Sequence, residues 1–272
     1  MIRQLQQKKS DGTDEARLPA KFIAICVFTF IAGALATVYF YRPMCCDMKM
    51  PGGWTMSMMW MQMPGQTWFT AGINFLLMWL AMMIVMMMPG ALPMFLKTRR
   101  RLTSLCYMAS GYFVIWLIVG IVIYALGVEL ASVAMQSESF SRIVPLLLGA
   151  WLITAGIIQF TLWKMIHLLR CRSFGGCSIS FLPHEKSFRV GCKQGAESCA
   201  CCAAPMTIQL ALGIMNPLVM IVVAIFIAAE KLLPRPEITT RVVGITAIAA
   251  GVTMSIGGDF APKFFSWVAL LI

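Results

Sequence analysis

Long apolar runs separated by shorter polar segments set the pattern of this chain. Six runs approach or exceed the roughly 20 helical residues that cross a hydrocarbon core. None of them alternates between apolar and polar residues, as the strands of an outer-membrane barrel do. The pattern therefore predicts an all-α integral membrane protein, a bundle of six transmembrane helices over residues 20–41, 68–88, 105–127, 143–166, 203–229 and 242–256.

The polar segments divide the rest of the chain. Residues 1–19 form a polar tail, residues 20–263 form the six-helix membrane domain, and residues 264–272 are too short to span and are expected at the interface. Two connections are long: an outer loop over 43–67 and a cytoplasmic stretch over 167–202. Because loops that lack a packing role tend to carry function, we look for a site in these two.

Composition and charge agree with a membrane protein and orient it. Hydrophobic residues make up 60% of the chain and charged residues 12%, whereas about a quarter of a soluble domain is charged. Most of the 22 Lys and Arg fall in alternate connections, so the positive-inside rule predicts that both termini are cytoplasmic and that the 43–67 loop faces outward. The net charge of +11 then reflects topology and contact with the lipid bilayer, and we expect no nucleic-acid partner.

The outer loop is rich in sulfur. Of the 23 methionines in the chain, eight lie between residues 43 and 67, together with two adjacent cysteines. A thioether is a soft ligand that selects Cu(I) over harder metals, and it has no proton to lose, so binding survives acid. The loop is thus a candidate Cu(I) site, with the ligand candidates Met44, Cys45, Cys46, Met48, Met50, Met56, Met58, Met59, Met61 and Met63.

The same loop has a second interpretation. Methionine is an adaptable apolar side chain, so the loop could pack into a groove between helices or against a partner. Trp54 and Trp60 suit that interpretation, since Trp also anchors at membrane interfaces. A disulfide between Cys45 and Cys46 would be strained, so free thiols or metal ligation are favoured.

A further set of methionines lies in the second apolar run, at positions 78, 82, 83, 86, 87 and 88. Met78, Met82 and Met86 share one helix face because they are four residues apart. Such a ladder could relay Cu(I) inward. Methionine also packs ordinary membrane helices, and the six spread over much of the circumference, so packing is the favoured interpretation.

The cytoplasmic stretch carries a second candidate site. His167 and Cys171 are one helical turn apart, and Cys199, Cys201 and Cys202 precede the fifth apolar run. Because Pro205 fits the first turn of a helix, the three thiols should lie near a helix N-terminus, which favours thiolate. Cytosolic thiols stay reduced, so these ligands suit Cu(I) or, alternatively, zinc.

Polar residues inside the apolar runs predict local features. Asn216-Pro217 should kink the fifth run, and Gln159 should point into the bundle. Glu230 and Lys231 close the fifth run and are most simply an interfacial ion pair. No phosphate-binding loop, zinc-protease helix or pair of intramembrane carboxylates is present, so we do not expect an enzyme.

From residue 79 onward, the chain resembles an uncharacterised bacterial family of predicted metal-binding integral membrane proteins. The resemblance implies metal binding in the bacterial inner (cytoplasmic) membrane and brings no established reaction. His167 stands where the family has a cysteine, and the 199–202 segment is shorter than the family's form. The matching elements are Ala81-Met82-Met83 through Pro89, Gly111-Tyr112 with Trp116, Gly156 to Gln159, Lys164, Cys171, Cys199, Cys201, Cys202, Gly213, Met215, Asn216, Glu230 and Lys231.

Together these patterns predict a membrane protein that handles Cu(I), as a trafficking or metallation factor for a copper enzyme of the same membrane. Two alternatives remain open. The chain could be an accessory subunit of a larger membrane complex, with the Met and Trp loop as its docking surface. It could also relay thiol redox equivalents through Cys45 and Cys46.

Overall fold

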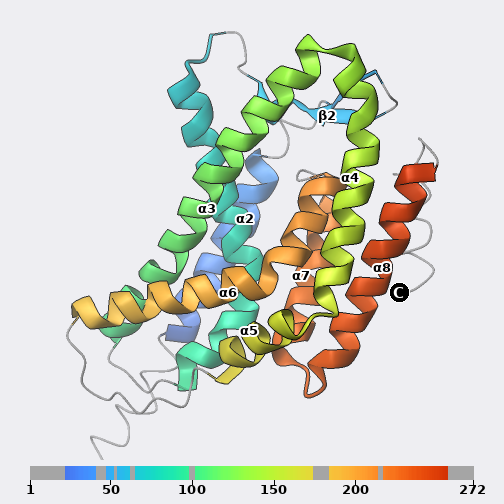
Figure 1. The fold of residues 1–272 in the computed structure, drawn as a ribbon. Coiled ribbons are helices and arrows are strands. Elements are labelled where there is room, and N and C mark those ends of the chain that lie inside the picture. The colour runs from blue at the N-terminus through green and yellow to red at the C-terminus, as the bar shows by residue number, and fades with distance from the viewer. Residues whose placement is uncertain are drawn as a thin grey trace, which may run out of the picture.

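The computed structural model describes residues 22–40, 47–51, 54–61, 65–97, 102–173, 184–213 and 217–256, and it is helical apart from one small hairpin (Figure 1). Strands β1 (Asp47–Lys49) and β2 (Thr55–Ser57) pair antiparallel and lead into the 3-10 helix η1 (Met58–Trp60). The all-α class is thereby confirmed. The helices are Phe22–Phe40, α2 (Trp68–Lys97), α3 (Leu102–Gln136), α4 (Glu138–Gln159), α5 (Leu162–Ser173), α6 (His184–Leu212), α7 (Pro217–Leu232) and α8 (Pro236–Ile256).

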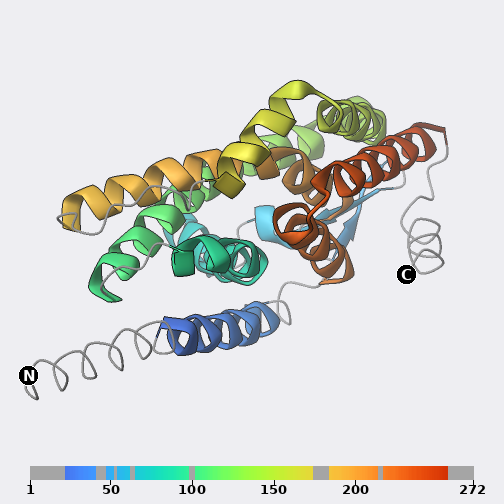
Figure 2. The same cartoon turned by 90° about the horizontal axis from the view of Figure 1, so that it is seen from below.

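Within the described residues, five helices are long and apolar enough to cross a membrane, so the chain is a multi-pass membrane protein. Each overlaps one of the predicted runs. Figure 2 shows the first of them along the edge of the bundle, where it exposes Phe28, Leu35 and Tyr39. The five spans are Phe22–Phe40, Trp68–Leu92, Thr103–Gln136, Glu138–Gln159 and Pro236–Ser255.

The predicted fifth span, residues 203–229, is not one helix. Helix α6 ends at Leu212, Gly213 follows with φ of 112°, and Pro217 opens α7. Glycine after a helix end and proline at a helix start each suit these positions, because glycine accepts positive φ and the missing N–H of proline is not needed in a first turn. The interruption predicted from Asn216-Pro217 is therefore a complete break between α6 and α7.

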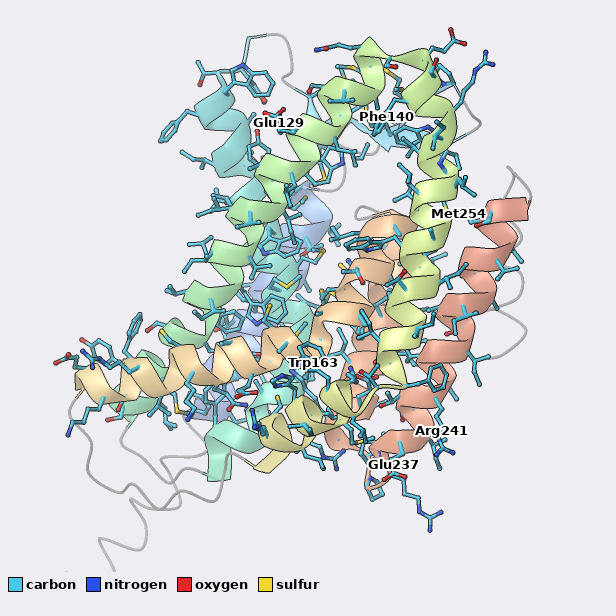
Figure 3. All side chains as sticks on the ribbon, viewed as in Figure 1. Glu129, Phe140, Trp163, Glu237, Arg241 and Met254 are labelled. Carbon is cyan, nitrogen blue, oxygen red and sulfur yellow. The ribbon has the colours of Figure 1, made fainter. Side chains whose placement is uncertain are left out.

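The end of α7 lies beside α5. Arg172 of α5 donates to the carbonyl oxygens of Glu230 at 2.9 Å and of Leu233 at 2.6 Å. Figure 3 shows Glu237 and Arg241 at the same end of the bundle as Trp163, with Glu129 and Phe140 at the other end. This differs from the six-span bundle predicted above, which places residue 231 and residue 172 at opposite ends.

The predictions for the chain ends fall outside the described residues. Residues 1–21 and 257–272 are not described, so the cytoplasmic location of both termini, the polar tail and the interfacial 264–272 segment stay predictions. Most of the predicted 167–202 loop is helical, because α5 extends to Ser173 and α6 begins at His184.

Glycines allow the backbones of α3 and α6 to touch. A Cβ at Gly191 of α6 would overlap the carbonyl oxygen of Met108, and one at Gly111 of α3 would overlap that of Phe188. Small residues permit such close approach of helices in membranes. The crossing brings Tyr112 of α3 against α6, where its hydroxyl lies 2.7 Å from Ser198 Oγ.

The core at the centre of this packing is rich in sulfur. One continuous buried cluster joins residues of the Phe22–Phe40 helix, η1, α2, α3, α5, α6 and α7. All six methionines of the second apolar run lie in it, a position that suits both packing and a relay. Its sulfur-bearing members are Cys26, Met59, Met78, Met82, Met83, Met86, Met87, Met88, Met108, Cys171, Cys201, Cys202 and Met206.

Candidate metal centres

The Met-rich segment is a folded hairpin fixed to the corner between α3 and α4. Met48 pairs with Met56 across the two strands. The indole of Trp54 donates to the carbonyl oxygen of Ser141 at 2.9 Å, and the hydroxyl of Ser141 donates to that of Pro51 at 2.8 Å. These bonds to α4 hold a segment that its Pro, Gly and polar residues had suggested to be an open loop.

The predicted loop ligands do not gather at one point. Met50 and Met56 are buried against Ala131 and Ala134 of α3, and this contact is apolar packing. Met48 is exposed. Four predicted ligands lie outside the described residues or have side chains that are not described, namely Met44, Cys45, Cys46 and Met63.

Three loop methionines do share a cavity. Met58, Met59 and Met61 line a space of about 20 Å³ together with Gln66 and Asn74. A volume of about one water-sized probe is enough for a single small guest. The neighbouring Trp60 packs its ring 5.5 Å from that of Phe75 on α2 and against Gly127 of α3, where a Cβ would overlap it. We refer to this cavity as the Met pocket.

The second candidate site is a buried group of thiols. Cys201 and Cys202 of α6 have sulfurs 3.5 Å apart, and Cys171 of α5 is hydrogen-bonded to Cys201. The amide of Gln194 donates to the carbonyl oxygen of Cys171 at 3.2 Å and lies 3.5 Å from its sulfur. We refer to Cys171, Cys201 and Cys202 as the thiol cluster. The structure thus brings together three of the five residues predicted for the cytoplasmic site.

Two buried lysines flank the thiol cluster. Lys164 of α5 donates to the carbonyl oxygen of Cys201 and forms an ion pair of 2.8 Å with Glu230. Lys231 donates to Ser198 Oγ at 2.8 Å and lies 3.9 Å from the sulfur of Met87. A Cβ at position 90 would overlap the Lys231 side chain, so Gly90 of α2 makes room for it.

The prediction that Glu230 and Lys231 form an interfacial ion pair is wrong. Glu230 is only 1% exposed and Lys231 only 8%, and the partner of Glu230 is Lys164. Consecutive residues on a helix point in different directions, so each side chain reaches a different neighbour.

The electrostatics of the cluster favour thiolate. A hydrogen bond from Cys201 lowers the pKa of the Cys202 thiol, and the ammonium groups of Lys231 and Lys164 lower it further, against a burial that raises it. A hydrogen bond to Cys201 likewise lowers the pKa of Cys171 to about 7. The predicted cause, a helix N-terminus, is wrong, because α6 begins at His184 and Pro205 lies inside it.

His167 lies outside the thiol cluster, and Cys199 lies at its edge. His167 Nδ1 lies 2.9 Å from the carboxylate of Glu197, and its ring packs edge-on against Trp163 at 4.5 Å. Cys199 is partly buried next to the cluster. In the part of the chain that is described, no three His, Cys, Asp or Glu side chains stand ready around a metal position. A metal at the thiol cluster would therefore replace the present hydrogen bonds between the sulfurs.

Several polar residues around the thiol cluster were not predicted to belong to it. They are Lys164, Gln194, Ser198 and Lys231. The signal was present in part, since two charged residues at the end of an apolar run require partners if they are buried. The sequence pattern does not show which residues of other helices contact Glu230 and Lys231.

These features define a multi-pass membrane protein whose core links soft sulfur ligands to buried charges. A family model described as PpoB2, copper chaperone, matches residues 76–254, and the chain belongs to this family. No curated protein and no solved structure matches it. The match runs from α2 into α8 and includes the thiol cluster, whereas the hairpin precedes it.

Membership in this family confirms the prediction that the chain handles copper and is not an enzyme. A copper chaperone passes its metal to a receiving protein, so such a partner is implied. Copper is accordingly the cargo of this protein.

Proposed function

We propose that the chain takes up Cu(I) at the Met pocket and holds it at the thiol cluster for delivery to a copper protein of the same bacterial cytoplasmic membrane. The thioethers of the Met pocket suit the capture of Cu(I), because they are soft ligands and protons do not compete with the metal for them. Thiolates bind with a full negative charge and suit retention.

The observation that carries the proposal is the pairing of three buried thiols with two buried ammonium groups. Cu(I) bound by three thiolates would carry two negative charges, which are expensive to bury without compensation. Lys231 and Lys164 supply positive charge within the same hydrogen-bonded network. Glu230 is already paired with Lys164, so Lys231 is the cation that remains for the metal complex.

Cu(I) suits the thiol cluster better than zinc. Structural zinc takes four ligands in tetrahedral geometry, whereas the cluster brings together three thiols. Of the two other predicted ligands, His167 is bound to Glu197, and Cys199 is only partly buried beside the cluster. Cu(I) is satisfied by a set of soft thiolates. The three thiols of the cluster therefore suit copper, the metal of the family.

The experiment compares copper retained by purified protein after anaerobic loading with Cu(I) and washing with a chelator. Changing all three cluster cysteines to serine should remove most of the retained copper, since serine keeps the size but not the soft ligand. The control changes two cysteines outside the cluster, the exposed Cys106 and the partly buried Cys192, to serine. Full retention by the triple variant would contradict the proposal.

A further inference from the structure

The Met pocket and the thiol cluster are joined by sulfur along α2. Asn74 and Phe75 of α2 line the pocket, and Met78 lies on the next turn of the same helix. Met82 and Met86 follow at intervals of four residues, about 6 Å apart along the helix axis. All three are at most 3% exposed and belong to the same buried cluster as Met59 and the three thiols.

The far end of this row reaches the thiol cluster through Lys231. Met87, next to Met86, has its sulfur 3.9 Å from Lys231 Nζ, which donates to Ser198 Oγ at 2.8 Å. Ser198 lies one turn before Cys201 and Cys202 on α6. Sulfur atoms and their polar neighbours therefore extend from the pocket to the thiols.

One of these sulfurs already interacts with a polar group. The amide of Gln209 on α6 donates to the sulfur of Met82 at 3.2 Å. The carbonyl oxygen of Gln209 is buried and has no hydrogen-bond partner among the described residues. Burying the Gln209 amide with its oxygen unpaired is unfavourable in hydrocarbon surroundings. If Met82 served only apolar packing, an apolar residue at position 209 would be more favourable.

We propose that Met78, Met82, Met86 and Met87 form an internal path along which Cu(I) passes from the Met pocket to the thiol cluster. This inference rests on the proposed function. In each step one copper–thioether bond forms as the preceding one breaks, and copper stays Cu(I), so no electron is transferred. In the last step copper leaves its last thioether and binds the three cysteines as thiolates, and each cysteine that is still protonated releases its proton as H⁺.

The chemistry of methionine suits such a path. Its side chain is flexible and unbranched, so it can swing between two positions of an ion inside a packed core. Its soft sulfur gives Cu(I) a ligand in a region without water and offers little to hard cations. Leucine fills nearly the same volume, so packing alone gives no reason for methionine at four successive positions of this kind.

The test uses the exchange of methionine for leucine, which keeps the bulk and removes the ligand. The Met82→Leu/Met86→Leu variant is reconstituted in vesicles, and Cu(I) is given only on the face that carries the hairpin. Loading of the thiol cluster is followed by the ultraviolet absorption of the copper–thiolate bond and by protection of the thiols from a membrane-permeant alkylating reagent. The control variant is Met254→Leu, on α8 and outside the row (Figure 3).

We expect the double variant to load the thiols at least tenfold more slowly than the wild type in vesicles, and the control to load normally. In detergent, where copper reaches both faces, the double variant should bind as much copper as the wild type. Normal loading of the double variant in vesicles would overturn the path and leave the proposed function intact.

Two other outcomes would also decide the question. If the double variant bound no copper in detergent either, the methionines would support the thiol cluster itself, and the path would be overturned. If the wild type bound no copper at the thiols in detergent, the proposed function would fail, and the path with it.

Discussion

The charge of a buried metal complex must be balanced by nearby side chains, and Lys231 is the clearest example. Its ammonium group is buried against a hydroxyl and a thioether, and among the described residues it forms no ion pair of its own. A cation in such surroundings needs a nearby anion. The thiol cluster supplies it as a thiolate, and a copper–thiolate complex would supply it permanently.

This charge pairing predicts that Lys231→Met lowers both copper binding and stability. Copper affinity should fall about tenfold, or about 1.4 kcal/mol, because the complex loses its cation. Thermal stability of the copper-free protein should also fall, because removing one partner of a buried charge pair leaves the thiolate without its cation. Competition with a Cu(I) chelator measures the first effect and thermal unfolding in detergent the second.

The control for this prediction is Lys186→Met, which removes an exposed lysine of α6. It should change neither quantity. Unchanged copper affinity in Lys231→Met would mean that the lysine serves only the packing of α7 against α6.

At the scale of residues, the sequence predicted which cysteines would form a site, but it did not predict which charged residues would be buried beside them. The spacing of five residues was sufficient to propose a common site, and three of them come together in the structure. The five are His167, Cys171, Cys199, Cys201 and Cys202. The same reasoning assigned Lys231 to the interface, because a charge at the end of an apolar run has the same pattern whether it faces headgroups or the protein interior. Only the packing of α7 against α5 and α6 separates the two cases.

Among the larger elements, the hairpin was the hardest to predict. Its strands have three residues each, too few for an alternating pattern, and they lie among the Pro and Gly residues that suggest a loop. The break between α6 and α7 was foreseeable, because Gly213 and Pro217 act through the local backbone alone. The first half of helix α6 could not be predicted in the same way, because it is polar. It is held against α3 by contacts of Gly191 that no local sequence pattern contains.

The hairpin divides its methionines into two groups, which should differ in function. Changing the three that line the Met pocket, Met58, Met59 and Met61, to leucine should abolish uptake of Cu(I) from the hairpin side. Changing Met50 and Met56 to leucine should have little effect, because these two pack against Ala131 and Ala134. Copper uptake into vesicles measures both.

A stable fold is required for this comparison, and leucine provides it by keeping the apolar volume. Equal loss of uptake in the two variants would show that the hairpin acts through its fold and not through a ligand set. In that case the docking hypothesis for this segment would gain support.

In the described part of the chain, five helices that could span a membrane are combined with a pair, α6 and α7, that turns back. Helix α6 enters the bundle from the end that carries α5, and α7 returns to that end, where Arg172 binds the carbonyl oxygens of Glu230 and Leu233. The basic residues Arg235 and Arg241 then lie on the same side as those of α5 and α6. With five crossings the excess of positive charge on one side, which orients membrane proteins, would be larger than with a sixth crossing. An odd number of crossings would also place the two termini on opposite sides, in contrast to the predicted cytoplasmic location of both.

This arrangement predicts the side on which each connection is exposed. In a background in which Cys45, Cys46, Cys106 and Cys192 are serine, Arg235→Cys should react with a membrane-impermeant maleimide from the same side as Lys186→Cys. Arg142→Cys, beside the hairpin, should react only from the opposite side. Labelling of Arg235→Cys together with Arg142→Cys would instead require a sixth crossing between α6 and α8. Such a crossing would separate Glu230 from Lys164, and the two lysines could not then share one thiol cluster.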